Sequence, residues 1–352
     1  MILVTGGAGF IGSSFVIDWL ATSDEPVLTL DALTYAGNLE NLDALTGDPR
    51  HVFVHGDIRD AALIRRLLAD HPIRGIVHLA AESHVDRSIL GPANFIETNV
   101  VGSFTLLEAA RQHWQALPAA EREQFRYLHV STDEVFGSLE PTAPPFTETN
   151  PYRPNSPYAA SKAAADHLVR SYHETYGLPT LTSHCSNNYG PRQFPEKLIP
   201  LCLHRALAGE TLPLYGDGLQ IRDWLYVGDH AAALRRLLEA GKPGGVYAIG
   251  GASELANRDV VRTLCEILDG LRPRADGRSY ADQIAFVADR PGHDRRYAID
   301  AGRMASELGW RPTVPFADGI RRTIDWYLAH ERWVANVTSG SYRGWVARQY
   351  QP

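Results

Sequence analysis

The sequence has few cysteines, and the three present, Cys185, Cys202 and Cys265, lie far apart. An odd number of cysteines at such spacings matches neither a disulfide framework nor a zinc site. We therefore expect reduced, mostly buried thiols in a cytoplasmic protein, and we predict no metal centre.

Long apolar runs and a surplus of basic charge are also missing. No apolar run approaches the roughly 18 residues that a membrane helix needs. The run from Met1 to Val4 is typical of a strand and leaves no room for a secretory signal. The formal net charge is −7, which gives no electrostatic footprint for nucleic acid. We expect no membrane and no nucleic-acid partner, so a phosphorylated substrate would need local groups of Arg, Lys and His.

What is present is the composition of an ordinary globular protein. Of the 352 residues, 44% are hydrophobic and 21% are charged, which supplies enough apolar material for a sizeable core. The length suggests one large domain or two unequal domains that share a cleft. Neither an internal repeat nor a low-complexity tract is visible.

Short apolar runs alternate with helix-length amphipathic segments in the first half of the chain. The runs are rich in Val, Ile and Leu, as buried parallel strands are. Regular succession of strand and helix predicts an α/β fold with a doubly wound parallel sheet, that is, a Rossmann fold. The predicted strands are 2–5, 27–31, 52–55, 76–79, 127–131 and 180–185, and the predicted helices are 13–22, 61–70, 93–114 and 157–176.

After about Asn188 the elements become shorter and Gly-Pro pairs punctuate them. We predict that residues 1–188 form the dinucleotide-binding domain and that residues 189–352 form mainly a smaller substrate-binding lobe. Two later segments, 222–227 and 246–249, are predicted to return to the main sheet.

A glycine-rich turn joins the first predicted strand to the first predicted helix. Gly6, Gly9 and Gly12 have the Gly-x-x-Gly-x-x-Gly spacing, with Phe10 and Ile11 between the last two. Small residues allow the backbone to approach a pyrophosphate at the positive end of the helix. The pattern is weak alone, but its place between a strand and a helix favours a dinucleotide site over a mere tight turn.

Asp31 ends the second predicted strand, about 20 residues beyond the glycines, where a carboxylate can accept from a ribose 2′-hydroxyl. It would repel a 2′-phosphate, so NAD is favoured over NADP; capping the next helix is the structural alternative. Residues after the third and fourth strands occupy positions that would line the adenine, ribose and nicotinamide. They are Asp57, Ile58, Leu79, Ala80, Ala81, Glu82 and Ser83.

Tyr158 and Lys162 stand four residues apart at the start of a predicted helix, and hence on one face. A lysine ammonium beside a phenol lowers the phenol pKa, so Tyr158 is predicted to act as a base near neutral pH. Because Tyr-x-x-x-Lys is common by chance, a solvated pair would be the simpler interpretation without the surrounding fold.

The fifth predicted strand leads into Thr132, Asp133 and Glu134. Two adjacent carboxylic acids at the carboxyl end of a central strand lie where active sites of this fold gather. Alone they would be interpreted as a helix cap or a solvated turn. Beside Tyr158 and Lys162 they match a dehydration, which needs one base and one acid.

These motifs resemble the extended short-chain dehydrogenases/reductases and, within them, the dTDP-glucose 4,6-dehydratase family over almost the full length. The departures are small: His184, Phe136, Ala32 and Ser253 stand where that family usually has Arg, Tyr, Lys and Asn. The matching stretches are 33–38, 79–89, 131–137, 156–162, 185–191, 197–200, 220–224 and 289–294.

The resemblance implies an NAD-dependent hydro-lyase that converts dTDP-glucose to dTDP-4-keto-6-deoxyglucose. By position, Tyr158, Thr132 and Lys162 would serve C4 oxidation, Glu134 would take the C5 proton and Asp133 would protonate the C6 hydroxyl. Leu33, Thr34, Thr98 and Asn188 would join the cofactor site. The substrate pocket would comprise Ser83, Thr132, Asn187, Lys197, Leu198, Pro213, Tyr215, Arg222, Asn257, Asp289, Arg290 and His293. A homodimer is expected, paired through the helices at 93–114 and 157–176.

Other interpretations stay open at this point. The nearest is another NAD-dependent nucleotide-sugar enzyme on the same fold: a 4,6-dehydratase for another nucleotide, a 4-epimerase or a decarboxylase. A silent NAD-binding regulator and a structural interaction module are the remaining classes.

Overall fold

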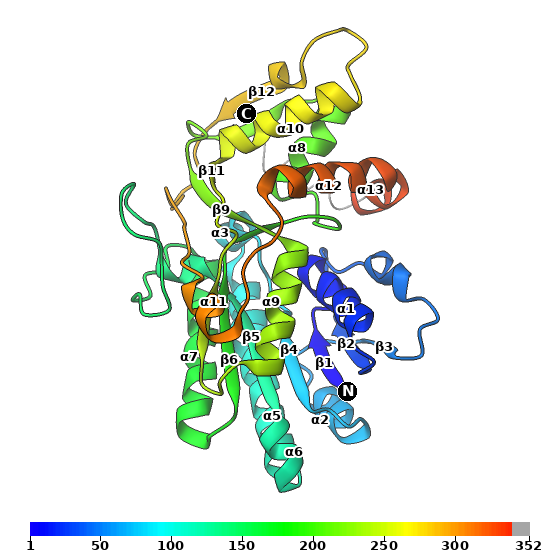
Figure 1. Cartoon of the computed structure of the whole chain (residues 1–352), viewed down its shortest axis with the longest axis vertical. Helices are drawn as coiled ribbons and strands as arrows, with labels where there is room; N and C mark the ends of the chain where they lie inside the picture. Colours follow the sequence, from blue (N-terminus) through cyan, green and yellow to red (C-terminus); the bar gives the residue numbers. More distant parts are fainter. Residues whose placement is uncertain (340–352) are drawn as a thin grey trace.

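The computed structural model describes residues 1–339, and a seven-stranded parallel sheet forms its centre (Figure 1). The strand order is β10-β6-β5-β4-β1-β2-β3, and each neighbouring pair is parallel. This confirms the predicted doubly wound fold. The strands are β1 (Ile2–Thr5), β2 (Val27–Asp31), β3 (His51–His55), β4 (Gly75–His78), β5 (Arg126–Thr132), β6 (Thr180–Cys185) and β10 (Val246–Ile249).

Helices cover both faces of this sheet, because alternate residues of the buried strands point to opposite sides. In β1, Ile2 and Val4 belong to one hydrophobic cluster and Leu3 to the other. The first cluster contains α1 (Phe10–Thr22), α9 (Val227–Ala240) and α11 (Gly302–Leu308), and the second contains α2 (Ala61–Asp70), α5 (Ser103–Ala116) and α7 (Pro157–Tyr176). We call the sheet with these helices the body.

The remaining elements form a lobe above the carboxyl ends of the strands in Figure 1. Its core gathers Tyr189, Trp224, Leu264 and Trp333 around a separate hydrophobic cluster. The lobe comprises β7 (Asn187–Tyr189), α8 (Leu198–Leu207), β8 (Leu212–Tyr215), β9 (Ile221–Tyr226), β11 (Glu254–Ala256), α10 (Asn257–Leu271), β12 (Ile284–Val287), α12 (Phe316–Ala329) and α13 (Glu331–Val337).

The two segments predicted to return to the sheet behave differently. Residues 246–249 do return, because β10 pairs in parallel with β6. The prediction for 222–227 was wrong: β9 pairs with β7 and β11 in a three-stranded sheet of the lobe. Both segments have the length of a strand and contain apolar residues, so the pattern alone could not tell which sheet each one joins.

The helix predicted over 93–114 is interrupted. It consists of α4 (Pro92–Phe95), a π-helical stretch η2 (Ile96–Gly102) and then α5. The Asn99 side chain bonds the backbone of Glu82 and the hydroxyl of Ser161. Such wide turns often accompany functional sites, and this one lies behind the loop that follows β4.

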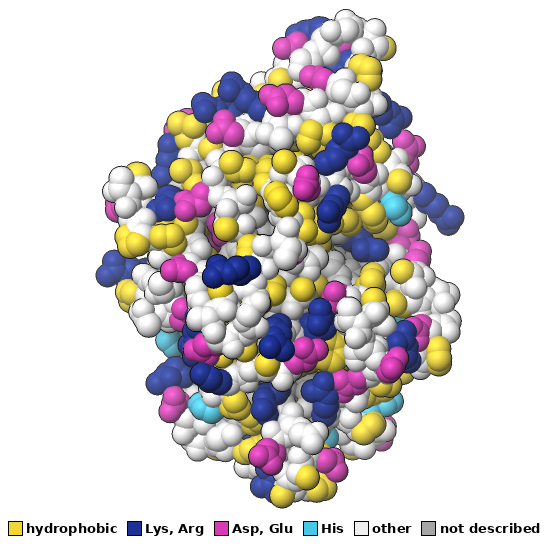
Figure 2. Space-filling model, viewed as in Figure 1, with side chains coloured by type: hydrophobic (Ala, Val, Ile, Leu, Met, Phe, Trp, Pro, Cys, Tyr) yellow, Lys and Arg dark blue, Asp and Glu magenta, His cyan; other side chains and the backbone are white. Residues whose placement is uncertain are grey.

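The other short elements connect these layers. They are η1 (Leu39–Leu45), α3 (Val85–Leu90), α6 (Ala119–Gln124), η3 (Asp133–Phe136) and η4 (Tyr280–Gln283). Within residues 1–339, no helix combines the length and the hydrophobicity needed to cross a membrane. On the face drawn in Figure 2, acidic and basic side chains are intermingled.

Candidate active site

A cavity of about 490 Å³ lies at the carboxyl ends of β1, β2, β4, β5 and β6. Its size is in the range of small-molecule sites. It brings together most of the residues predicted for cofactor and catalysis and some of those predicted for substrate. They are Gly6, Gly9, Phe10, Ile11, Gly12, Asp31, Thr34, Asp57, Ile58, Leu79, Ala80, Ala81, Glu82, Ser83, Thr98, Thr132, Asp133, Glu134, Tyr158, Lys162, Asn187, Asn188 and Lys197.

The glycine turn is built for close backbone approach. Gly6 has a φ of +71°, and a Cβ there would lie 2.7 Å from the Ala80 nitrogen. A Cβ at Gly12 would lie 2.1 Å from the Gly6 oxygen. Larger residues would therefore push the turn and the start of α1 apart. The cradle that remains fits a pyrophosphate at a helix N-terminus.

Asp31 holds this turn to the end of β2. Its carboxylate accepts from the backbone N–H groups of Ala8, at 2.9 Å, and Leu33, at 2.8 Å. Burial raises its pKa despite those two hydrogen bonds. Asp31 thus shapes the turn and also faces the cavity, where a ribose hydroxyl could donate to it. Leu33 contributes its backbone and lies outside the cavity lining.

The turn after β5 aims the catalytic candidates. The Thr132 hydroxyl accepts from the Glu134 N–H at 3.3 Å and so caps η3, which directs Asp133 and Glu134 into the cavity. The same hydroxyl lies 3.4 Å from Asp133 Oδ1. Asp133 is 1% exposed, and its Oδ2 has no hydrogen-bond partner among the described residues. An unpaired buried acid of this kind fits a substrate group as its partner.

Burial dominates the proton affinities of this cluster. It raises the pKa of Asp133 well above the usual range, and the nearby Glu134 and Asp223 add to the shift. It also raises the pKa of Glu134, but the cations Arg290, Lys197 and Arg222 oppose that shift. The two carboxyls therefore have unequal surroundings, as an acid and a base require.

The prediction that Lys162 lowers the pKa of Tyr158 was wrong. Burial, followed by the charge of Glu134, raises the pKa of Tyr158 well above 10.0, and the Thr132 hydroxyl only partly opposes this. Lys162 donates instead to the Val130 carbonyl at 2.9 Å. The spacing placed both side chains at the cavity, but it could not show which acceptor the ammonium takes.

Behind Lys162 lies a buried network that sequence reasoning missed. Asp166 contacts His129 Nε2 at 3.1 Å and His184 Nε2 at 3.0 Å, and it accepts from the Ser131 hydroxyl at 3.0 Å. Burial alone would raise the Asp166 pKa, yet the hydrogen bonds from the two histidines leave it far below its usual value. Asp166 is one helical turn after Lys162, which was the only signal available.

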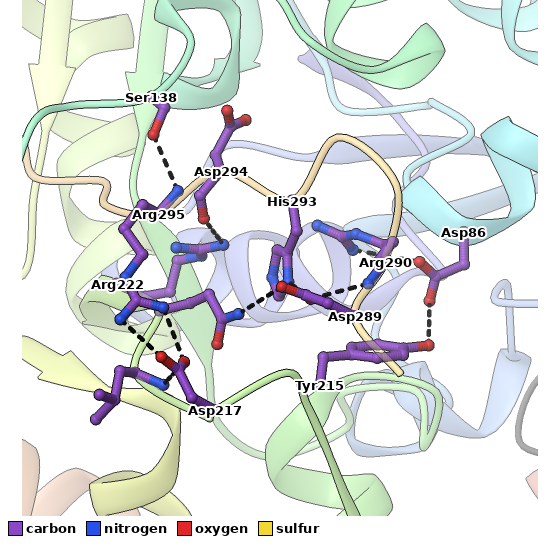
Figure 3. Close-up of polar contacts among 12 residues, drawn as sticks. Asp86, Ser138, Tyr215, Asp217, Arg222, Asp289, Arg290, His293, Asp294 and Arg295 are labelled. Carbon is purple, nitrogen blue, oxygen red and sulfur yellow. Dashed lines mark hydrogen bonds and ion pairs between the residues drawn. The ribbon is translucent and has the colours of Figure 1, made fainter. Parts of the chain in front are cut away.

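Several predicted substrate residues lie in the lobe, outside the lining of this cavity. Figure 3 shows Arg222, Arg290, His293, Asp289 and Tyr215 in one polar group. Asp289 contacts His293 Nδ1 at 2.6 Å. Leu198, Pro213 and Asn257 also lie in the lobe, at the start of α8, in β8 and at the start of α10.

Arg222 is deeply buried for a cation. It is 5% exposed, donates to the backbone oxygens of Ile221 and Asp294, and lies 4.3 Å above the ring of Tyr297. A planar guanidinium held in this way can donate to two oxygens of a phosphate group.

Other lining residues were not predicted. The lining of the cavity also includes Leu30, Ala32, Ala36, Gly37, Gly56, Arg59, Asn94, Val130, Ser131, Cys185, Ser186, Gln193, Phe194 and Glu196. Most are direct neighbours of predicted residues, so adjacency was the available signal. In residues 1–339, no group of three or more His, Cys, Asp or Glu side chains is placed to hold a metal ion.

Comparison with known proteins agrees with this geometry. The GDP-mannose 4,6 dehydratase family model matches residues 3–323. The dTDP-glucose 4,6-dehydratase of Xanthomonas campestris pv. campestris (strain B100) is 59% identical over 341 residues, which is 97% of each chain. That of Salmonella typhimurium is 54% identical over 358 residues, or 99% of each chain.

Solved structures give the same picture. The dTDP-glucose 4,6-dehydratase DesIV from Streptomyces venezuelae, solved with NAD bound, has a TM-score of 0.86 and 48% identity, covering 96% of this chain and 99% of its own. The UDP-glucose 4-epimerase of Thermotoga maritima, solved with UDP-glucose, has a TM-score of 0.81 and 29% identity, covering 93% and 98%.

Proposed function

The chain belongs to the dTDP-glucose 4,6-dehydratase family, and from this premise we propose that it converts dTDP-glucose to dTDP-4-keto-6-deoxyglucose and water. One observation carries the proposal: the buried Asp133 carboxyl and the half-buried Glu134 carboxyl have unequal surroundings and share a cavity with a phenol and a dinucleotide-type glycine turn. NAD is the cofactor.

The residues that would hold NAD are those of the glycine turn, Asp31 and the loop after β4. When bound, NAD supplies the hydride acceptor and later the donor, and its oxidised ring carries a positive charge that favours a phenolate. The Asp31 carboxylate would repel a 2′-phosphate, which supports NAD over NADP.

Oxidation begins with loss of the C4 hydroxyl proton to Tyr158. Thr132 orients that hydroxyl, and Lys162 adds a positive charge to the cavity lining while it donates to the Val130 carbonyl. Burial lowers the Lys162 pKa, but Asp166 opposes this shift and helps to keep the ammonium charged. Tyr158 is therefore the base of the first step.

Elimination of water follows from the acidity of C5 beside the new ketone. Glu134, whose pKa three nearby cations moderate, takes the C5 proton as a carboxylate. Asp133, whose raised pKa keeps it protonated, donates to the leaving C6 oxygen through its unpaired carboxyl. The roles follow from the difference between the two surroundings.

The proton balance of a whole turnover involves Thr132 as well. Tyr158 gains the C4 hydroxyl proton, Asp133 loses the proton that leaves in water, and Glu134 returns a proton to C5 as C6 is reduced. One proton must therefore pass from the phenol to the Asp133 carboxyl before the next cycle. The Thr132 hydroxyl, 3.4 Å from Asp133 Oδ1, is placed to relay it.

The lobe would bind the nucleotide diphosphate. We assign this role to Arg222 and Arg290, with Lys197 and Asn187 at the sugar end of the cavity. The remaining predicted substrate residues, Ser83, Leu198, Pro213, Tyr215, Asn257, Asp289 and His293, would complete the pocket. In this assignment residues 1–188 serve the cofactor and residues 189–352 mainly the nucleotide sugar.

A 4-epimerase is the second candidate, because the Thermotoga maritima epimerase shares the fold. An epimerase needs no acid and base for C5 and C6, so Asp133 and Glu134 favour dehydration.

Incubation of the protein with dTDP-glucose, followed by the absorbance of the 4-keto-6-deoxy product in alkali, tests the proposal. UDP- and CDP-glucose in parallel test the nucleotide preference. The variant Glu134→Gln should still form transient NADH while solvent deuterium no longer enters C5. Full dehydration by this variant would contradict the role of Glu134.

We also propose a homodimer. Large apolar side chains are exposed along the surface from α3 to α5: Leu90 (73%), Ile96 (47%) and Phe104 (47%). A second copy of the same face would cover them. Sedimentation should give twice the chain mass, and a monomer would contradict this. The three cysteines are buried and free, which supports a cytoplasmic location; cell fractionation tests it.

A further inference from the structure

Asp86 is a buried carboxylate of the connecting helix α3 that contacts two residues of the lobe. It lies in α3, directly after the loop that follows β4, and its side chain is 6% exposed. One oxygen accepts from Arg290 Nη1 at 3.3 Å, and the other accepts from the Tyr215 hydroxyl at 3.3 Å (Figure 3). A single carboxylate therefore joins β8 and the loop after β12 to α3.

A buried negative charge at this position opposes binding of an anionic ligand. Asp86 lies beside cations proposed to bind a diphosphate, and a carboxylate there would repel that ligand. The repulsion is offset only while Asp86 is paired with a cation. Arg290 supplies the pairing with Nη1, while its buried Nε has no hydrogen-bond partner among the described residues. The pair thus fixes one part of the guanidinium and leaves another donor available.

The same segment holds a second cation. Lys197 donates to the Ser83 carbonyl at 2.9 Å. Arg87 forms an ion pair at 3.0 Å with Glu196, the residue before Lys197. Residues 83–87 therefore contact two of the three cations assigned to the substrate, Arg290 and Lys197.

We propose that Asp86 is a positioning residue that holds Arg290 in place for the substrate diphosphate. The role rests on the proposed function, because it assumes that Arg290 meets a diphosphate. Holding a long side chain in advance removes the entropy cost of ordering it on binding. Asp86 does not take part in the chemistry, so its loss should weaken binding and leave the catalytic steps nearly unchanged.

The test compares Asp86→Asn with a matched control in the lobe. The control is Asp217→Asn, which breaks an Asp–Arg pair with Arg295 at 2.8 Å whose side chains are 52% and 47% exposed. Calorimetry on the NAD-loaded protein measures dTDP and thymidine binding. In Asp86→Asn the affinity for dTDP should fall about tenfold, and the affinity for thymidine should not change. The KM for dTDP-glucose should rise about tenfold, and kcat should stay within threefold of the wild-type value. Asp217→Asn should have the wild-type values of both affinities, of KM and of kcat.

A double-mutant cycle with Arg290→Gln completes the test. Arg290→Gln alone should weaken dTDP selectively, and adding Asp86→Asn should then change nothing further. Unchanged dTDP affinity in either single variant overturns the role. So does an equal loss of dTDP and thymidine, because that indicates a displaced lobe, and so does a persisting Asp86 effect in the Arg290→Gln background. Wild-type protein that binds no dTDP and does not convert dTDP-glucose overturns the proposed function and this role together.

Discussion

The body and the lobe prepare their halves of the site in different ways. At the end of β5, Asp133 is 1% exposed and one of its oxygens has no hydrogen-bond partner among the described residues. In the lobe, Arg222 is also buried, at 5% exposed, but it has two carbonyl partners and an aromatic ring beneath it. The body leaves a buried acid unsatisfied, whereas the lobe satisfies its buried cation.

This difference matches two chemical tasks. An acid or base must change its protonation during the reaction, so its proton affinity has to be shifted, and burial does that. A binding cation must keep its charge and its place, so hydrogen bonds and stacking hold it. The predictions below test this division.

The largest effect is expected for Asp133→Asn in the body. The amide cannot donate the proton that the leaving C6 oxygen needs, so kcat should fall by about 10³-fold. Because the Asp133 pKa is raised, the acid form persists to higher pH, and wild-type kcat should fall as pH rises through that pKa. In the variant, kcat should not show this fall with rising pH. Quenched-flow assays across pH measure both; a variant with wild-type kcat would remove Asp133 from the mechanism.

Asp166→Asn should reduce stability rather than act on the substrate. Its pKa is lowered in the fold, so the carboxylate contributes stability above the ordinary Asp pKa near ~3.9, and that contribution is lost as pH falls. Asparagine would leave the buried donors of His129, His184 and Ser131 without their carboxylate acceptor, and an unsatisfied buried polar group costs about 1–3 kcal/mol. Denaturant unfolding at neutral pH should show this loss, and the difference from wild type should shrink in acid.

A surface pair of the lobe serves as the control for this experiment. Asp325 contacts Arg321 at 3.1 Å, with side chains 53% and 52% exposed. Asp325→Asn should change the free energy of unfolding by less than about 1 kcal/mol. Equal losses in the two variants would mean that the buried network adds nothing special.

Arg222→Lys should give a moderate change confined to binding. Lysine keeps the charge that lowers the pKa values of Asp133 and Glu134, so kcat should stay within threefold. It loses the fork-shaped donor set, and the KM for dTDP-glucose should rise about tenfold. Steady-state kinetics separate the two constants. A fall in kcat with KM unchanged would place Arg222 in the chemistry instead.

Sequence patterns predicted best what depends on neighbours along the chain. The six early strands followed from apolar runs, and the turn at Gly6 to Gly12 followed from its place between a strand and a helix. The four-residue spacing of Tyr158 and Lys162 placed both at the cavity, because one helical face carries both. Each of these inferences needed only local geometry.

What failed depends on contacts between distant residues. β9 pairs with β7, a strand of the lobe that lies more than 30 positions earlier in the chain. The π-helical turn at Asn99 depends on the loop after β4 and on Ser161 in α7. The upward shift of the Tyr158 pKa depends on burial and on the charge of Glu134. Asp166 gave no signal beyond its place one helical turn after Lys162, because its partners His129 and His184 come from two different strands.

The smallest effect is expected at Gly270 in α10 of the lobe, and it contrasts with the glycine turn of the body. A Cβ at Gly12 would meet the Gly6 oxygen at 2.1 Å, whereas a Cβ at Gly270 would meet nothing within 4 Å. Gly270 lies within a helix, where glycine costs roughly 0.5–1 kcal/mol relative to alanine. Gly270→Ala should therefore raise the free energy of unfolding by about 0.5 kcal/mol without changing NAD content or KM. Gly12→Ala should instead release NAD, as the absorbance of the purified protein would show. A lower free energy of unfolding in Gly270→Ala would contradict this prediction. It would mean that another molecule contacts this helix face, because the fold itself leaves the space around Gly270 open.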